Sequence, residues 1–493
     1  MMGGQGVLES FDEQLVMVRK DAIQRGLIRN MDETPKLWLI WVFGQWAVQI
    51  ANPEDFKELL TKTEQYEKFN FDDIPGLELS RKFMGTNIAM VRTPIWKTHR
   101  RIVNPAFRRG WATSLFGSPA RNLLAQLDKV TATKQPMDAA DFMQRMTLDA
   151  LSVAAFRKNF NSLANPNAPM VATYNRIMTG IMNPVFALFG PLGQFLPMSK
   201  RLDKDIHSFN QFMFELVDGK LAEMQSKDDH ADEEDDDNKD LLELMIRAQL
   251  KEGSTFSRED LRSNCVAFFI AGHDTTANAL TFALYMLGMN PDKQEKARKE
   301  ILDIMGDVSS GTSADEFPYP TNDQQNQMSY LTCIIKETMR IWPSIVVMPM
   351  RELMSPATLH SGLSLPRGSL ISSNVYALQR AKEYWGADAN QFKPERWTKL
   401  HDDMAGAGTA PGDSAPLHPG AHGFMWTPFG GGSRFCLGSN FSIIEQRVVL
   451  AMMLLRYTWK VVGNDKALRG RPESEPGILL HPHGIMLELT RRN

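Results

Sequence analysis

The stretch that decides the fold lies near the C-terminus and reads Phe429-Gly-Gly-Gly-Ser-Arg-Phe-Cys-Leu-Gly438. Its three consecutive glycines remove side chains where backbone must lie against a flat ligand, and they permit left-handed turns that direct amide hydrogens at the sulfur of Cys436. The residues 439–455 that follow favour a helix, so the sulfur lies beside a helix N-terminus, which stabilises a thiolate. A lone cysteine is more often a small buried hydrophobe. The glycines and Arg434 instead favour a thiolate, and a thiolate held in this way can ligate iron.

The spacing Phe-x-x-Gly-x-Arg-x-Cys-x-Gly resembles the haem-binding loop of the cytochrome P450 family. The resemblance implies haem b as the cofactor, held by Cys436 as the metal ligand. It also implies that Arg434 contacts a haem propionate, that Phe429 packs beside the sulfur, and that Gly438 belongs to the cofactor site. Thiolate ligation favours O–O cleavage at the iron.

The same resemblance implies a mainly α-helical haem-thiolate fold with a small β-rich region. It covers residues 35–493 as one catalytic domain, with residues 1–34 as an N-terminal segment. Bulky strand formers on both sides of Gly44 predict a two-stranded hairpin over residues 37–50. The acidic run 228–237 is expected to be a solvated loop, and the irregular stretch 405–423 a surface insertion.

Composition narrows the class of protein. The 493 residues are 43% apolar and 23% charged, which is typical of a large globular enzyme. Cys265, Cys333 and Cys436 are too scattered for a disulfide framework or a zinc cluster, and they fit a reducing compartment. The net charge of −3 argues against nucleic acid as a partner. The apolar run 37–43 is far shorter than the roughly 20 residues that span a bilayer, so no membrane anchor or signal peptide is expected in this chain.

A long helix is predicted in the middle of the chain. Ser257-Arg-Glu-Asp260 is typical of a capping box, and a helical pattern continues to about Met289. A helix of about 30 residues is ~45 Å long. Its centre, residues 266–276, is apolar and then abruptly polar. Buried Asp and Thr side chains are costly without partners. One interpretation is that the threonines bond back to their own helix and bend it.

Beside a thiolate-haem loop, this polar stretch resembles the oxygen-activation motif of the family. The resemblance implies that Thr275 would hold the distal oxygen atom and that Asp274 would feed protons from solvent. It also implies that Gly272 leaves space for dioxygen. We expect His273 to face the other side of the helix as a bystander.

Two motifs with charged residues, Glu337 with Arg340 and the segment 392–397, support the resemblance. Glu337 and Arg340 lie on one helical face, where an exposed pair of little energetic value is the default interpretation. The segment 392–397 resembles the second half of a family motif. Together Glu337, Arg340 and Arg396 are expected to form a buried triad that locks the loop before Cys436, because guanidinium binds carboxylate bidentately.

A second set of residues is expected at the haem. Trp96 and Arg100 project from one side of a helix, and in the family this pair meets a propionate; His99 lies in the same motif. Arg351 is expected at the other propionate. The alternative for the helix is an amphipathic element with a solvated basic edge.

The substrate site is predicted from apolar and aromatic residues, which favour a hydrophobic substrate. Core packing is the alternative for many of them. Three prolines and two glycines within residues 184–197 predict a mobile lid. The predicted lining residues are Phe186, Phe189, Phe268, Ala271, Ile345, Val346, Val347 and Leu479.

The resemblance implies a monooxygenase that inserts one oxygen atom of O2 into a steroid, fatty acid or terpenoid, steroid hydroxylation being the leading hypothesis. Electrons would come from NADPH through a separate NADPH–cytochrome P450 reductase. The motifs resemble eukaryotic microsomal members, fungal ones included, so we expect association with the endoplasmic reticulum membrane at its cytoplasmic face. One alternative is a peroxide-using or rearranging haem-thiolate enzyme, which has no need of the Asp274–Thr275 pair. Another is a non-catalytic haem-binding sensor.

Overall fold

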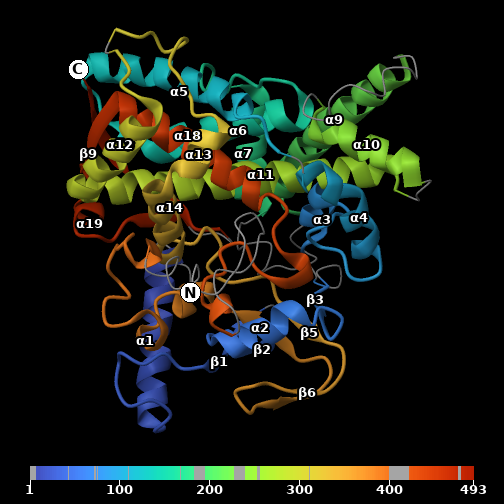
Figure 1. The fold of residues 1–493 in the computed structure, drawn as a ribbon. Helices are drawn as coiled ribbons and strands as arrows, with labels where there is room; N and C mark the ends of the chain where they lie inside the picture. Colours follow the sequence, from blue (N-terminus) through green and yellow to red (C-terminus); the bar gives the residue numbers. More distant parts are fainter. Residues whose placement is uncertain are drawn as a thin grey trace. The chain divides into compact units, whose positions relative to one another are not determined.

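A computed structural model describes residues 7–42, 44–70, 74, 76–108, 110–166, 168–181, 195–226, 239–252, 256–309, 311–398, 421–475 and 479–492. The predicted lining residues Phe186 and Phe189 lie outside the described residues. So do most of the predicted lid, the acidic run and most of the predicted insertion. The described chain is mainly helical with small sheets (Figure 1), which confirms the predicted fold class.

The chain divides into two compact units. The first unit comprises residues 1–69, 120–144 and 275–493, and the second comprises residues 70–119 and 145–274. The chain passes from one unit to the other at four points, three of which lie within helices, and the point in α11 lies between Asp274 and Thr275. These helices are α5 (Ser114–Thr133), α6 (Ala139–Phe156) and α11 (Arg258–Met289).

The main sheet of the first unit has five strands in the order β1-β2-β8-β5-β3. The predicted hairpin is confirmed, with Val42 opposite Gln45 and a positive φ of 78° at Gly44. β2 pairs in parallel with β8, and β5 pairs antiparallel with both β8 and β3. The strands are β1 (Leu37–Val42), β2 (Gln45–Ile50), β8 (Leu370–Ser373), β5 (Arg351–Leu353) and β3 (Tyr66–Lys68).

Helix α2 (Pro53–Thr61) packs on this sheet, as Figure 1 shows beside β1 and β2. The helix begins at Pro53, where the missing N–H costs nothing, and the side chain of Asn52 accepts a hydrogen bond from the Asp55 amide. Phe56 and Leu60 of its apolar face pack into the core of the sheet. The C-terminal end of α2 is thereby fixed, and it becomes the support for the cysteine loop.

The first unit contains further short sheets and most of the remaining helices. The helix α18 is almost wholly buried, and α12 and α14 pack against it. The smaller sheets are β4-β12-β9 (Met137–Asp138, Met486–Arg491, Tyr457–Val462), β6-β7 (Ala357–Thr358, Ser364–Leu365) and β10-β11 (Glu473–Glu475, His481–His483). The helices are α1 (Val7–Gln24), α12 (Pro291–Met305), α13 (Asn322–Gln327), α14 (Ser329–Ile341), α15 (Val375–Leu378), α16 (Lys382–Trp385), α18 (Ser439–Arg456) and α19 (Asp465–Leu468).

The second unit is helical within its described residues. Its core contains a group of aromatic rings, in which the centroid of Phe269 lies 4.9 Å from Tyr174 and 5.4 Å from Phe209. Its helices are α3 (Glu78–Met84), α4 (Ile95–Arg108), α7 (Pro169–Ile181), α9 (Pro197–Ser226) and α10 (Leu241–Glu252).

The long helix α11 has the predicted start and end. The Asp260 amide donates to Ser257 Oγ at 3.1 Å and the Ser257 amide donates to Asp260 Oδ2 at 2.8 Å, which is the capping box. The helix ends at Met289 after 32 residues, a length of ~48 Å. It therefore carries the polar stretch 272–276 near its middle.

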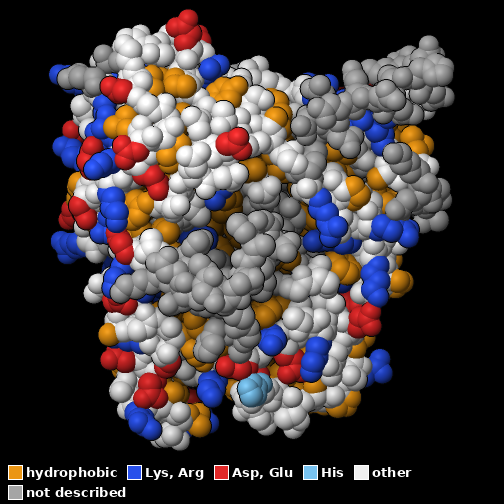
Figure 2. All heavy atoms as spheres, viewed as in Figure 1, with side chains coloured by type: hydrophobic (Ala, Val, Ile, Leu, Met, Phe, Trp, Pro, Cys, Tyr) orange, Lys and Arg blue, Asp and Glu red, His pale blue; other side chains and the backbone are white. Residues whose placement is uncertain are grey.

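The surface of the first unit near α12 and α19 mixes basic and acidic side chains, as the left part of Figure 2 shows. Pairs such as Lys296 with Glu395, 3.0 Å apart, account for this pattern. Among the described helices, none combines the length and apolar character needed to cross a membrane.

Candidate functional site

The cysteine loop is a short turn of helix that ends at the start of α18. The Cys436 amide donates to the Phe429 carbonyl at 3.0 Å, which closes the loop, and a 3-10 turn occupies Gly432–Arg434. The side chain of Cys436 is exposed, and Gly438 caps α18 two residues later. A sulfur at a helix N-terminus is favoured as the thiolate. Cys265 and Cys333 differ, because burial raises their pKa values to about 12 and about 11.

Two glycines in the loop are required by its geometry. Gly430 and Gly432 have φ values of 73° and 63°, which lie in the left-handed region. A Cβ at Gly432 would also lie only 2.1 Å from the carbonyl oxygen of Leu60, at the end of α2. The loop therefore lies directly on α2, and the Oγ atoms of Thr63 and Ser433 are 3.2 Å apart.

Positive charge accumulates beside this loop. Lys68 of β3 lies directly opposite Arg351 of β5 in the sheet, where like charges repel. Arg434 of the loop interacts electrostatically with both, and its Nη2 lies 3.2 Å from Glu67 Oε2. We call these four residues the cationic cluster. It has three basic groups and one carboxylate, and all four residues belong to the first unit.

The cationic cluster is electrostatically strained as it stands. Burial, and then the Arg434 charge, lower the pKa of Arg351 to about 10. Burial, and then Arg351 and Arg434, lower the pKa of Lys68 well below its usual value. A bound anion would relieve this strain by favouring the charged form of both groups.

The residues of the first unit fit an iron porphyrin. One exposed cysteine at a helix N-terminus suits a thiolate ligand, and the cationic cluster suits two propionates. Within the described ranges no group of three or more His, Cys, Asp or Glu is arranged to hold a metal ion. In an iron porphyrin the porphyrin supplies most of the iron's ligands, so a single protein donor such as Cys436 is enough.

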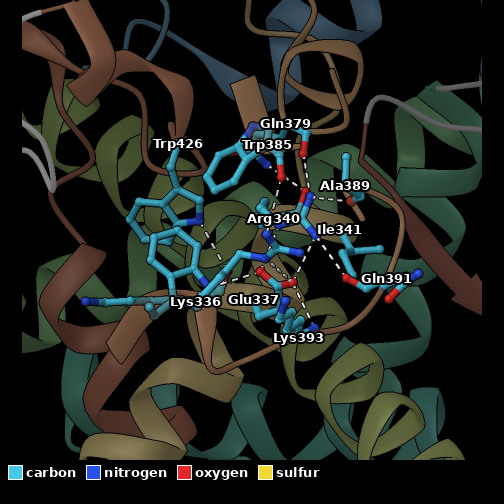
Figure 3. A network of polar contacts seen from close by, with 12 residues as sticks. Lys336, Glu337, Arg340, Ile341, Gln379, Trp385, Ala389, Gln391, Lys393 and Trp426 are labelled. Carbon is cyan, nitrogen blue, oxygen red and sulfur yellow. Dashed lines mark hydrogen bonds and ion pairs between the residues drawn. The ribbon is translucent and has the colours of Figure 1, made fainter. Parts of the chain in front are cut away.

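Glu337, Arg340 and Arg396 lie together in the interior of the first unit. Figure 3 shows Glu337 beside Arg340. Arg340 binds the Glu337 carboxylate through Nε and Nη2 at 2.8 and 2.9 Å, and Arg396 Nε lies 2.8 Å from Glu337 Oε1. Arg396 Nη1 also lies 3.5 Å from Asp388 Oδ1. We call these four residues the balanced cluster, because two carboxylates face two guanidiniums.

The donors of Arg340 that do not bind Glu337 bind backbone carbonyls. Figure 3 shows Arg340 among Gln379, Ala389 and Gln391, whose carbonyl oxygens lie at 2.7, 2.7 and 3.3 Å from its Nη atoms. Each buried N–H of this guanidinium therefore has an acceptor, which is the condition under which a buried charge is tolerated.

The network continues to the segment that precedes the cysteine loop. The Gln379 amide group donates to the carbonyls of Met339 and Arg340, and its oxygen accepts from the Thr427 amide at 3.0 Å. The indole of Trp426 donates to the Lys336 carbonyl at 3.2 Å. The segment before Phe429 is thus hydrogen-bonded to α14 and to Gln379. The role of the triad as a lock on the loop stays a prediction.

In the second unit, α4 carries Trp96, His99 and Arg100. Trp96 is buried and Arg100 is half-buried. His99 faces α11 instead of standing out as a ligand: its Nδ1 is 3.3 Å from Asn264 Nδ2 and its Nε2 is 3.8 Å from Asp260 Oδ1. Burial lowers its pKa, against the opposing effects of Asp260 and Asn264. Cofactor contact by Trp96, His99 and Arg100 stays a prediction.

Asp274 is held by two side chains of the second unit. The hydroxyl of Tyr174 donates to Asp274 Oδ2 at 2.7 Å, and His273 Nε2 lies 3.1 Å from Asp274 Oδ1. His273 Nδ1 lies 2.7 Å from the Phe269 carbonyl, one turn earlier. Burial, and then Asp274, raise the pKa of Tyr174 well above 10, so its hydroxyl keeps its proton. His273 was expected to face the other side of the helix, whereas its ring lies along α11 between the Phe269 carbonyl and the Asp274 carboxylate.

The two adjacent threonines have different surroundings in the first unit. Thr276 donates to Ser442 Oγ of α18 at 2.9 Å, so its hydroxyl joins two helices and does not bond back to its own. The carbonyl of Thr275 accepts from Ser344 Oγ at 2.7 Å. Thr275 is half-buried and Thr276 is buried. The role of Thr275 at oxygen stays a prediction.

One stripe of α11 is more accessible than its surroundings. Ala271 is exposed and Gly272 and Thr275 are half-buried, whereas most of the helix is buried. A Cβ at Gly272 would lie 2.8 Å from Leu151 Cδ1 of α6. Close helix packing is therefore a structural reason for this glycine, beside the predicted space for dioxygen.

The predicted lining residues of the first unit separate into two groups. Ile345 and Val347 are half-buried, whereas Val346 between them is 2% exposed. A place of these residues in the substrate site stays a prediction. Leu480 donates from its amide to the Ser344 carbonyl at 2.9 Å, which brings Leu479 beside this segment.

Among the predicted lining residues of the second unit, Ala271 is exposed and Phe268 is buried. The ring centroid of Phe268 lies 5.2 Å from that of Phe107 in α4. Phe268 therefore contributes to helix packing, which was the alternative for this group of residues.

Two residues of the site were missed by the sequence analysis. Tyr174 lies 100 residues from Asp274 in the chain, and nothing around it forms a motif. Lys68 follows Glu67 in a three-residue strand whose partner is more than 280 residues away. Only the strand pairing shows that Lys68 and Arg351 are opposite each other.

Comparisons with known proteins show the family of this chain. The family model described as Cytochrome P450 matches residues 9–489. The chain is 26% identical to human Cytochrome P450 4X1, over 87% of this chain and 79% of that protein. It is 27% identical to pig Taurochenodeoxycholic 6 alpha-hydroxylase, over 76% of this chain and 70% of that protein. It is 28% identical to rice Cytochrome P450 734A6, over 90% of this chain and 78% of that protein.

Proposed function

The chain belongs to the cytochrome P450 family of haem-dependent monooxygenases, and we propose that it hydroxylates a hydrophobic substrate with electrons delivered from NADPH by a separate reductase. The observation that supports this most strongly is the exposed Cys436 at the N-terminus of α18, with the cationic cluster beside its loop. Haem supplies the iron at which O2 is bound and activated. Cys436 would ligate that iron, and Arg434, Arg351 and Lys68 would bind the propionates.

Side chains of this protein would deliver the protons that the reaction consumes. Monooxygenation consumes two protons for each water formed, and a buried site needs a side chain that delivers them. Asp274 would donate a proton, and the Thr275 hydroxyl would hold the oxygen that receives it. The intact pair favours a monooxygenase over a peroxide-using or rearranging enzyme.

For the substrate class we propose a steroid, with fatty acids and terpenoids as the next candidates. Half-buried Ile345, Val347 and Leu479 offer apolar contacts without a charged partner. One relative is named as a Taurochenodeoxycholic 6 alpha-hydroxylase, and this name supports a steroid.

For the electron donor we propose NADPH–cytochrome P450 reductase, at the cytoplasmic face of the endoplasmic reticulum membrane. The similarity to human, pig and rice proteins supports a eukaryotic partner. Reconstitution of product formation with NADPH and a purified reductase tests the partner, and fractionation of cells that express the protein tests the location.

The first experiment is the absorbance difference spectrum of the dithionite-reduced protein with and without carbon monoxide. A strongly red-shifted Soret band is expected for a thiolate-ligated carbonyl, and it should be lost in Cys436→Ser. A band typical of histidine-ligated haem, or no haem at all, would overturn the assignment of Cys436.

A second experiment addresses oxygen activation. In Thr275→Ala we expect unchanged haem content and substrate-induced spectral shift, but more peroxide and less product per NADPH consumed. Thr276→Val is the matched control, because the Thr276 hydroxyl contacts Ser442 instead. An unchanged product yield in Thr275→Ala would contradict the proposed role, and equal leakage in both variants would do so as well.

A further inference from the structure

The hydrogen bonds around His273 fix where its protons are. A carbonyl oxygen only accepts, so the contact of 2.7 Å between Nδ1 and the Phe269 carbonyl requires a proton on Nδ1. In neutral imidazole the other nitrogen then has a lone pair. This lone pair would face Asp274 Oδ1 at 3.1 Å, in a place where both side chains are buried.

Two lone pairs in contact without a proton would be costly in a buried site. A single proton between Nε2 and Oδ1 removes this conflict, whichever of the two atoms carries it. The His273–Asp274 pair is then electrically neutral with that proton in place. Hydrogen-bond bookkeeping alone therefore assigns one shared proton to the pair.

Tyr174 is hydrogen-bonded to the other oxygen atom of the Asp274 carboxyl group. Its hydroxyl donates to Asp274 Oδ2 at 2.7 Å from α7 and is fully buried. The Thr147 hydroxyl donates to the His273 carbonyl at 3.2 Å from α6, which fixes the same turn of α11. All of these residues belong to the second unit. Asp274 is thus fixed from both sides.

We propose that His273 and Tyr174 are positioning residues that keep Asp274 loaded with one shared proton, directly before Thr275 in the chain. The proposal rests on the proposed function, because it assigns a purpose to a proton that oxygen activation consumes. It adds two residues to the acid–alcohol pair that the sequence motif contains.

The proton balance is simple. When Asp274 releases the shared proton, the pair is left as neutral His273, protonated at Nδ1, and an Asp274 carboxylate. The Tyr174 O–H bond remains intact and stabilises the new charge by its hydrogen bond. One proton from solvent water restores the pair, and no bond other than those to hydrogen changes.

His273→Gln separates the holding of Asp274 from the supply of its proton. The glutamine amide still donates a hydrogen bond but carries no transferable proton. We expect normal haem content and a normal carbonyl spectrum, with product per NADPH lowered by about tenfold, a size typical of outer-shell partners of a functional group. We also expect a larger solvent deuterium isotope effect. Wild-type coupling and isotope effect in this variant would overturn the shared proton.

Tyr174→Phe tests the second contact, with Tyr285→Phe as its matched control. Tyr285 is equally buried, lies in α11 and donates to the Ala467 carbonyl instead. We expect a loss of coupling of about threefold to tenfold in Tyr174→Phe alone. An equal loss in both variants would mean that only packing is affected, and it would overturn the role of Tyr174.

A stability measurement tests the contacts without turnover. In a double-mutant cycle of Tyr174→Phe and Asp274→Ala, denaturant midpoints of the holoenzyme should be non-additive, because either change alone removes the same hydrogen bond. Additive midpoints would overturn the contact. If the wild-type enzyme lacks the carbonyl band of a thiolate-ligated haem, the proposed function is contradicted. If the band is normal and the variants behave like the wild type, only the role of His273 and Tyr174 is contradicted.

Discussion

The balanced cluster and the cationic cluster lie in the same unit and are made of the same kinds of side chain, yet their charges differ. In the balanced cluster two carboxylates face two guanidiniums, and the remaining donors of Arg340 bind carbonyls. In the cationic cluster, as far as its contacts are described, Arg434 pairs with Glu67, and the charges of neighbouring basic groups act on Lys68 and Arg351.

The difference in charge indicates that the balanced cluster holds the backbone in place, whereas the cationic cluster is suited to bind an anionic ligand. A buried charge that is neutralised within the protein stabilises one arrangement of the backbone, here the segment before the cysteine loop. In the cationic cluster, burial and neighbouring basic groups lower the pKa values of Lys68 and Arg351, and a bound anion would favour their charged forms. The cationic cluster is therefore the place where the cofactor's charge is expected.

The largest effect is predicted for the balanced cluster. Glu337→Gln leaves Arg340 and Arg396 buried without their shared carboxylate, which costs about 3–5 kcal/mol. We expect little soluble protein and no haem absorbance in what is recovered. Soluble yield and the pyridine haemochrome assay measure both quantities. A variant with normal haem content would show that the cluster does not hold the loop.

A smaller and opposite effect is predicted for Arg351 of the cationic cluster. Arg351→Met removes a buried charge that Lys68 and Arg434 repel, so the denaturant midpoint should not fall. Haem should instead leave faster, by about tenfold, because one charge-assisted contact is lost. Haem transfer to an excess of an acceptor protein measures the rate. A lower midpoint with an unchanged transfer rate would reverse the distinction between the two clusters.

A pH dependence is predicted for Lys68, because burial, Arg351 and Arg434 lower its pKa. Without an anion the folded protein binds this proton less tightly than the unfolded chain does. The penalty is full below the folded pKa and is relieved as the pH rises towards the usual value of about 10.5. Haem binding has the opposite sign, because propionates favour the charged ammonium.

Haem release should therefore accelerate as the pH rises through the lowered pKa of Lys68. The profile should flatten in Lys68→Met, and a wild-type slope in that variant would exclude Lys68 as the titrating group. Haem transfer rates between pH 7 and 10 provide the measurement.

The smallest effect is predicted at the edge of the balanced cluster. Lys393 Nζ lies 2.9 Å from Asp388 Oδ2, and the Lys393 side chain is 53% exposed. Such pairs contribute between 0 and about 1 kcal/mol. Lys393→Ala should leave haem content and denaturant midpoint nearly unchanged, which makes it the control for Glu337→Gln. A large loss of haem content or a much lower denaturant midpoint would show that the exposed Lys393 also belongs to the balanced cluster.

The sequence predicted those parts of the site that are contiguous or regularly spaced. Cys436 and Arg434 are two residues apart, and Glu337 and Arg340 are one helical turn apart, so their arrangement follows from local geometry. The long helix was predicted from its capping box and its apolar centre. The hairpin was predicted from its strand formers and Gly44.

Contacts between distant segments could not be predicted in this way. The position of Lys68 opposite Arg351 depends on the pairing of β3 with β5. The contact of Tyr174 with Asp274 depends on the packing of α7 against α11. The direction of the His273 ring and the burial of Val346 depend on rotamers and on which side of an extended segment faces the core. Such orientations are set by tertiary packing and leave no pattern in the sequence.

The parallel pairing of β2 with β8 has a consequence for biosynthesis. Gln49 and Ser372, which contact each other across this pair, are 323 residues apart in the chain. At about 5–20 residues per second, the ribosome needs ~15–65 s to make the intervening segment. Throughout that time β2 has β1 on one side, and its other edge lacks the partner strand β8. The whole of the second unit is translated within this interval. We therefore expect the nascent chain to expose one open strand edge until β8 is made, shortly before the cysteine loop.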